Sequence, residues 1–438
     1  MASLDQPKLR VLSAQRLKHQ GQEYAVLEDP LGVFTDPVLI PIDGYHWIVR
    51  HFDGQTQLRE IQARVLRETG QLVPLTELER LVARLDQAMV LDGPTFAAFY
   101  ESFSRQQVRP AALAGRSYAG TERALRAQLA RFFAHSKGAG MPHAWSGMAD
   151  GNVPVVVATS RKLRGILSPH IDFSRGGPVY TWSYKELVEQ SDADTFIILG
   201  VAHQYCRNRF ALTRKDFQTP LGLVPTDRAY VEKIAALAAR DLFEDELSHR
   251  TEHSIEFQVV FLQYLLGGRR EFSIVPILVG SFHDLMEAEI DPIETDEVRK
   301  FVEALRAAES ASGKRVVYIG GIDLCHVGPE FGDPELLDGA TLDQVRMFDQ
   351  AMLDRAAASD PAGWFGTAAR VGNRWRVCGL AATYTMLHAM GPSRGRLLKY
   401  DQAVDDRRTC CVSFASLAFD SSDADADADA DAEVHSRA

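Results

Sequence analysis

The sequence predicts an α/β protein: an α/β/α sandwich around a mixed, largely buried sheet, preceded by a small N-terminal α+β domain. Apolar runs of strand length recur in the second part of the chain, among them Phe196 to Leu199, Ile274 to Val279 and Val316 to Ile319. Helical patterns lie between them, such as His253 to Leu266, where apolar residues recur along one stripe. Strands that are apolar throughout and alternate with helices indicate a sheet covered on both faces.

Residues 1–110 are expected to form the small N-terminal domain. Glu23 to Leu27 and Pro37 to Ile40 are short runs typical of strands. Two amphipathic helices are predicted to follow, near residues 58–68 and 75–89. Short strands followed by helices are typical of a winged-helix-like domain, which would either stabilise the chain or dock a protein partner.

Three further segments complete the expected organisation. Residues 111–150 are predicted to be a helical linker, because a helical pattern from Thr121 to Phe133 gives way to a loop rich in Gly and Pro. Residues 151–420 would form the α/β domain. Residues 421–438 are an Asp-Ala repeat that offers nothing to bury and repels itself, so a disordered tail is expected.

Composition excludes several classes of protein. The chain has 438 residues, of which 46% are apolar and 24% charged, so a large core can form without disulfides. Its net charge is −11, which argues against a nucleic-acid partner, because such proteins carry a basic stripe. No apolar run is long enough for a membrane span, and the N-terminus lacks a signal-peptide pattern. Five cysteines without a CxxC pair favour a cytoplasmic location and exclude a zinc ribbon.

Metal-binding side chains stand at the ends of three predicted strands. His170, His203 and Cys325 each follow a buried apolar run within a few residues. Open α/β sheets bind ligands outside the carboxyl ends of their strands. Imidazole suits zinc, copper and iron, and a thiolate adds softness. The sequence therefore predicts a metal site made of these three residues, with one coordination position open for water or substrate.

Other side chains are expected near this metal. His326 directly follows Cys325, so both are not expected to face one metal, and His326 would instead donate a proton or orient a ligand. Cys206 is a rival thiolate in a polar loop. His253, at the start of a predicted helix, would point its ring into the cleft, with Glu256 on the next turn holding it.

A competing motif is His249-Arg250-Thr251-Glu252-His253, which matches the H-x-x-E-H signature of a class of zinc metallopeptidases. Glu330 lies downstream, near where a third ligand would be sought. The motif requires both histidines on one face of a helix. Ser248 and Thr251 are instead typical of residues that lead into a helix starting at Glu252 or His253, and Glu330 lies in a stretch with several Gly and Pro residues.

Short motifs occur in a fixed order from about residue 155 to residue 419: Ser168-Pro169-His170, Leu199-Gly200 to His203, Glu252-His253-Ser254-Ile255-Glu256, Val275 to Gly280, Asp323-Leu324-Cys325-His326 and Cys378-Gly379. In these motifs the chain resembles the Memo family, which is similar to class III extradiol dioxygenases. The resemblance implies an α/β/α sandwich around a mixed sheet. It also implies a metal site at His170, His203 and Cys325, lined by His253. Residues 1–110 resemble PqqD-like winged-helix modules.

The chain departs from the family pattern beside the predicted ligands. Ile171-Asp172-Phe173 follows His170, where the family has an Ala-Gly-aromatic run, so the Asp172 carboxylate is added near the metal. Gly320-Gly321-Ile322 precedes Asp323, where the family has two serines. Substrate contacts are therefore expected to differ from those of the family.

The leading hypothesis is a metal-binding protein that acts as a non-haem iron- or copper-dependent redox enzyme of dioxygenase-like type. Fe(II) is the expected metal, with copper or zinc as alternatives. His253 and His326 would transfer protons, and Asp172 and Asp323 would orient imidazoles or substrate. The substrate would be a small molecule or a peptide, with no nucleic-acid or membrane partner. The alternatives are a non-catalytic metal- or peptide-binding scaffold and an HxxEH-type zinc metallopeptidase.

Overall fold

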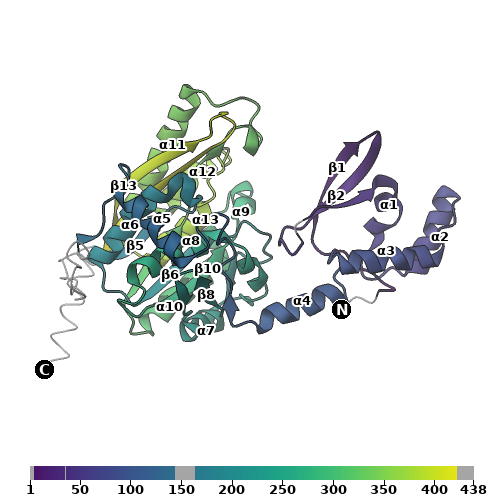
Figure 1. The fold of residues 1–438 in the computed structure, drawn as a ribbon, viewed down its shortest axis with the longest axis horizontal. Coiled ribbons are helices and arrows are strands. Elements are labelled where there is room, and N and C mark those ends of the chain that lie inside the picture. The colour runs from purple at the N-terminus through teal and green to yellow at the C-terminus, as the bar shows by residue number, and fades with distance from the viewer. Residues whose placement is uncertain (1–3, 35, 144–162, 422–438) are drawn as a thin grey trace. The chain divides into compact units, whose positions relative to one another are not determined.

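A computed structural model describes residues 4–34, 36–143 and 163–421. The chain divides into two compact units, Met1–Gln106 and Gln107–Ala438 (Figure 1). The expected Asp-Ala tail lies outside the described residues from residue 422 on, as does the beginning of the expected α/β domain.

The N-terminal unit has the predicted order of strands followed by helices. An antiparallel sheet of order β1-β2-β3 is followed by helices whose apolar residues form a separate core, including Ile61, Val65 and Leu78. Helix α2 begins with a capping box, in which Gln57 and Glu60 bind each other's backbone N–H groups. The elements are β1 (Ser13–His19), β2 (Gln22–Glu28), β3 (Val38–Pro41), α1 (Ile42–Trp47), α2 (Leu58–Thr69), α3 (Leu75–Gln87) and α4 (Pro94–Arg105).

The segment predicted to be a linker contains a helix that belongs to the larger unit. Helix α5 (Glu122–Ala134) buries Leu125, Leu129 and Phe133, which repeat at intervals of four residues along one face. This face packs against α6 (Phe173–Gln190) and α8 (His253–Leu266). The apolar stripe therefore makes α5 part of the core rather than a spacer.

The larger unit is built on an eight-stranded mixed sheet of order β12-β14-β5-β11-β6-β10-β7, with β13 paired to β14. The inner strands β5, β11, β6 and β10 are parallel, whereas β14 runs antiparallel to β5 and β7 antiparallel to β10. The strands are β5 (Leu163–Ser168), β6 (Thr195–Val201), β7 (Phe210–Leu212), β10 (Ser273–Val279), β11 (Val316–Gly321), β12 (His326–Val327), β13 (Ser393–Val404) and β14 (Cys411–Ser421). A smaller sheet joins β4 (Val108–Arg109), β8 (Asp216–Thr219) and β9 (Gly222–Val224).

Helices cover both faces of the large sheet, so the predicted α/β/α sandwich is confirmed (Figure 1). Along β6, Phe196 and Ile198 join the core under α5, α6 and α8, whereas Ile197 and Leu199 join the core on the opposite face. That opposite layer contains α7 (Arg228–Leu237), α9 (His283–Glu287), α10 (Asp296–Ser310), α11 (Gly339–Ala357), α12 (Pro361–Ala369) and α13 (Leu380–Met390). Among the described residues, no helix combines the length and apolar character needed to cross a membrane.

Two glycines let the start of α8 approach the strand ends closely. A Cβ atom at Gly200 in β6 would lie 2.5 Å from Ser254 Oγ, and one at Gly321 in β11 would lie 2.5 Å from the Ser254 carbonyl oxygen. Ser254 Oγ in turn donates to the Val201 carbonyl at 2.9 Å. Ser254, the second residue of α8, is thereby held against the carboxyl ends of two central strands.

Candidate metal centre

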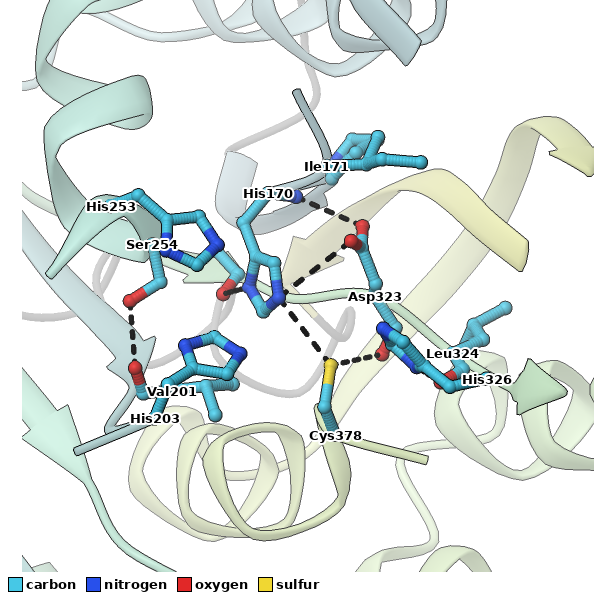
Figure 2. A network of polar contacts seen from close by, with 12 residues as sticks. His170, Ile171, Val201, His203, His253, Ser254, Asp323, Leu324, His326 and Cys378 are labelled. Carbon is cyan, nitrogen blue, oxygen red and sulfur yellow. Dashed lines mark hydrogen bonds and ion pairs between the residues drawn. The ribbon is translucent and has the colours of Figure 1, made fainter. Parts of the chain in front are cut away.

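Three histidines from different elements converge at this edge of the sheet (Figure 2). His170 follows β5, His203 follows β6, and His253 is the first residue of α8. Their ring centroids are 4.9 Å apart for His170 and His203, 5.2 Å for His170 and His253, and 4.7 Å for His203 and His253. One ring nitrogen of each lies within 4.8 Å of the other two. Within the described residues, this group has the geometry needed to hold a metal ion.

Each of the three rings is fixed by an acceptor at Nδ1. The Gly321 carbonyl oxygen lies 2.8 Å from His170 Nδ1. Glu252 Oε1 lies 3.0 Å from His203 Nδ1 and 3.1 Å from His253 Nδ1. Because carbonyl and carboxylate oxygens only accept, each Nδ1 donates its hydrogen, and Nε2 is the nitrogen that carries the electron pair when the ring is neutral. Metal-binding histidines are commonly oriented by such outer acceptors.

Glu252 holds two of the histidines at once. Its Oε2 accepts from the His203 backbone N–H at 2.9 Å, and its Oε1 accepts from the N–H groups of His253 and Ser254 at 2.8 and 3.0 Å. Burial raises the pKa of Glu252, but hydrogen bonds to His203 and His253 outweigh burial and hold the pKa well below its ordinary value. Burial lowers the pKa of His253, but Glu252 outweighs it and the net shift is upward.

His170 is buried and contacts a second carboxyl group. Burial, followed by the charges of His203 and His253, lowers the pKa of His170 well below its ordinary value, so this imidazole is neutral and able to bind a metal. Asp323 Oδ1 accepts from the His170 backbone N–H at 3.0 Å, and Asp323 Oδ2 lies 3.6 Å from His170 Nε2. Burial raises the pKa of Asp323 to about 7.

Cys378, in the turn before α13, brings a thiol to the same nitrogen of His170. Its Sγ lies 3.4 Å from His170 Nε2 and 3.5 Å from the Asp323 carbonyl oxygen (Figure 2). Bonds of about 2.1 Å to nitrogen and about 2.3 Å to sulfur at a tetrahedral metal place the two ligand atoms about 3.6 Å apart. The observed separation is close to this value, but burial and the Asp323 charge raise the pKa of the Cys378 thiol well above its ordinary value, and within the described residues the group that could hold a metal contains the three histidines and not Cys378.

Sequence reasoning assigned no role to Cys378, although the Cys378-Gly379 pair stood among the family motifs. The residue that could have pointed to Cys378 in the sequence is Gly379, which directly follows it. A Cβ atom there would lie 2.6 Å from Ile322 Cβ and 2.7 Å from the Asp323 carbonyl oxygen. Only a residue without a side chain lets this turn approach the segment after β11, and that approach brings Cys378 to the site.

The structure does not bring Cys325 into the group, although it was predicted as a ligand. Its thiol donates to Asp349 Oδ1 at 3.0 Å, and the Tyr400 hydroxyl donates to Asp349 Oδ2 at 2.7 Å. The Cys325 backbone N–H is held by Ser413 Oγ at 2.9 Å. Burial and the Asp349 carboxylate raise the pKa of Cys325 well above its ordinary value, which keeps the thiol protonated.

Three other residues were predicted to lie near the metal: His326, Asp172 and Cys206. His326 is drawn near Asp323 in Figure 2, and its Nδ1 lies 3.1 Å from the Leu324 carbonyl; burial lowers its pKa to about 4. Asp172 precedes α6, and its charge helps to raise the pKa of His253. Burial raises the pKa of Cys206 to about 12, and this thiol is outside the group.

The structure does not assemble the zinc peptidase motif. His249 lies in a separate 3₁₀ turn, Glu246–Arg250, whereas α8 begins at His253, so one helix face does not carry both rings. The His249 Nε2 donates to the Ala211 carbonyl at 3.0 Å, and burial lowers its pKa to about 3. Glu330 accepts from Thr409 Oγ1 instead of joining the histidines.

The sequence of the larger unit matches a known protein family. A family model described as "Memo-like protein" matches residues 109–418. A MEMO1 family protein of Aquifex aeolicus (strain VF5) is 26% identical over 422 residues, covering 94% of this chain and 99% of its own. A MEMO1 family protein of Methanopyrus kandleri is 30% identical over 320 residues, covering 71% and 98%. A crystal structure of an uncharacterized protein from Escherichia coli K12 covers 59% of this chain and 99% of its own, with 13% identity and a TM-score of 0.32.

Proposed function

Since the chain belongs to the Memo-like protein family, we propose that it is a metalloprotein whose ion is held by His170, His203 and His253, with the Cys378 thiol beside His170. The observation that carries this proposal is the convergence of three imidazoles whose Nδ1 atoms are all bound to acceptors. Their Nε2 atoms are left as metal donors. The side chains of His203 and His253 are 36% and 33% exposed, so solvent or substrate has access.

Iron or copper is the proposed metal, and its role when bound is redox chemistry. Imidazole nitrogen suits both metals, and a neighbouring carboxylate such as Asp323 is typical of non-haem iron sites. The carboxyl group of Asp323, with a pKa of about 7, can hold or release a proton at Oδ2 near neutral pH. Glu252 keeps the rings of His203 and His253 in place throughout. The five cysteines are free thiols, which supports the proposed cytoplasmic location.

Metal content is the measurement that tests this proposal. Protein purified without oxygen or chelator is expected to contain about one iron or copper ion per chain by elemental mass spectrometry. His170→Ala and His203→Ala should lose the ion, whereas His249→Gln, which alters a buried histidine outside the group, should retain it. Wild-type protein that binds neither metal after reconstitution would contradict the proposal.

A second candidate is a metal-binding scaffold without turnover, in which the N-terminal unit recruits a partner. It is favoured by β1, the edge strand of its sheet, where all seven residues are exposed and free to meet another chain. Oxygen uptake separates the two candidates. Uptake by Fe(II)-loaded protein with small phenolic or peptide substrates, abolished in His253→Ala, supports the enzyme. Metal bound without uptake on any substrate favours the scaffold.

A further inference from the structure

A buried ion pair joins Arg109 to Glu256, which lies in the first turn of α8, the helix that begins with His253. The side chains of Arg109 and Glu256 are both 0% exposed, and Arg109 Nη1 lies 2.5 Å from Glu256 Oε2. The guanidinium also donates from Nε to the His249 carbonyl oxygen and from Nη2 to the Glu252 carbonyl oxygen, each at 2.7 Å. Its planar face lies over the ring of Phe217, 5.0 Å from the centroid. One side chain thus spans both backbone carbonyls of the turn that leads into α8.

Glu256 also accepts hydrogen bonds from residues 112–118 and so links this segment to α8. It accepts from the backbone N–H groups of Ala112 and Leu113 at 3.1 and 3.0 Å, and from the Tyr118 hydroxyl. It was expected to hold His253, but its oxygens bind this segment and Arg109 instead. Residues 107–119 are therefore attached to the first turn of α8 through one carboxylate.

Net stability is a poor explanation for this pair. Removing two charges from water offsets most of their attraction, and replacing a buried ion pair by apolar residues is often neutral or stabilising. The position of the contacts points to another role. The Glu252 backbone, which Arg109 holds, belongs to the residue whose carboxylate binds Nδ1 of His203 and Nδ1 of His253.

We propose that Arg109 is a positioning residue of the metal centre, which fixes the Glu252 backbone and, through the Glu252 carboxylate, the His203 and His253 rings. This inference rests on the proposed metal site. Arg109 lies three residues beyond Gln106, the last residue of the N-terminal unit. The first residues of the larger unit are therefore tied to Glu252, whose carboxylate holds the rings of His203 and His253.

The test uses Co(II) as the probe, with the full chain and a variant that removes both buried charges, Arg109→Met together with Glu256→Met. This variant leaves no unpaired charge and is expected to fold, but it cannot donate to the Glu252 carbonyl. Its dissociation constant for Co(II) should rise about 10- to 100-fold, as is usual when an outer partner of a metal ligand is lost. The Co(II) absorption spectrum should change as well.

A matched control removes another ion pair of the same unit, Arg164 with Glu309, which lies near the amino end of β5. Arg164→Met with Glu309→Met should leave Co(II) affinity and spectrum unchanged. A folded Arg109→Met/Glu256→Met protein with wild-type affinity and spectrum would overturn the inference, because a purely structural pair predicts that result. Wild-type chain that binds no Co(II) would instead remove the proposed metal site.

Should the double variant fail to fold, Arg109→Lys decides the question. Lysine keeps the charge opposite Glu256 but lacks the planar fork that reaches both backbone carbonyls. Weaker Co(II) binding by folded Arg109→Lys, by about tenfold or more, supports the positioning role. Unchanged binding by this variant overturns it.

Discussion

Two cysteines compete for the role of thiolate ligand, and the structure distinguishes their surroundings. Cys378 Sγ adjoins His170 Nε2, whereas Cys325 Sγ is bound to Asp349. We expect Co(II)-loaded protein to show a thiolate-to-metal charge-transfer absorption that disappears in Cys378→Ser and persists in Cys325→Ser. The reverse pattern would show that the metal draws Cys325 away from Asp349.

His249 should make the stability of the protein depend on pH. Its pKa falls from about 6.5 in an unfolded chain to about 3 in the folded protein, so only the unfolded chain binds the proton between these values. The free energy of unfolding should therefore decrease as pH falls below about 6.5, by about 1.4 kcal/mol per pH unit. His249→Gln keeps a donor for the Ala211 carbonyl but does not titrate.

The corresponding measurement is urea unfolding of wild-type and His249→Gln protein at pH 8 and pH 5. The free energy of unfolding of the wild type, relative to that of His249→Gln, should be about 2 kcal/mol lower at pH 5 than at pH 8. If this difference is the same at both pH values, His249 takes up its proton as readily in the folded protein as in the unfolded chain, and the expectation is wrong.

The sequence predicted some residues of the candidate site and not others, for a physical reason. His170 and His203 follow continuous apolar strands, and the direction of parallel strands brings their ends to one edge. His253 was recognisable from the start of its helix. Cys378 lies in a turn with no strand before it, so its approach to His170 depends on tertiary packing alone. Cys325 follows a strand as expected, but the buried Asp349 on a distant helix takes its thiol.

At the scale of elements, the close contact between α8 and β11 controls the site. Gly321→Ala would place a Cβ atom 2.5 Å from the Ser254 carbonyl oxygen, and backbone must move to relieve it. We expect a loss of about 1–3 kcal/mol of stability and weaker metal binding, because the Gly321 carbonyl also holds His170. Thermal unfolding and Co(II) titration measure the two effects.

Gly366 in α12 provides the control for this substitution. A Cβ atom there would meet nothing within 4 Å, so Gly366→Ala should stabilise the helix by about 0.5–1 kcal/mol and leave metal binding unchanged. If Gly321→Ala and Gly366→Ala have the same effect on stability and on metal binding, the close approach at Gly321 is contradicted.

The sequence predicted individual elements better than their assignment to domains. The strands around Ile197, Ile277 and Ile319 were recognisable because they are apolar on both faces. The helix of residues 122–134 was also recognised, but its three buried residues are too few to reveal a partner helix in advance. It was therefore assigned to a linker.

At the scale of the whole molecule, the two units have separate cores. The core of the N-terminal unit contains residues such as Leu27, Ile61 and Leu78, and the cores on the two faces of the large sheet contain none of them. We expect two transitions in a calorimetric scan of the full chain. Added metal should raise the midpoint of only one, because a ligand stabilises the unit that binds it. A single transition that moves as a whole would contradict this expectation.

The sandwich architecture followed from the alternation of apolar strands and helices, but the order of strands did not. Pairing between β14 and β5 joins residues about 250 positions apart, for example Leu417 and Leu167. Such pairings depend on the finished fold and leave no local pattern. The boundary after Gln106, four residues before the predicted one, was likewise set by β4 pairing with β8.

The place of β14 has a consequence for how the protein is made. This strand is the last described element to leave the ribosome, yet it lies between β12 and β5 in the sheet. Until it is synthesised, β5, which precedes His170, has one open edge, and the segment that carries Asp323 lacks its anchor at Ser413. The growing chain therefore has no finished site before β14 is added, so we expect the ion of the proposed metal site to bind only after this strand has been made.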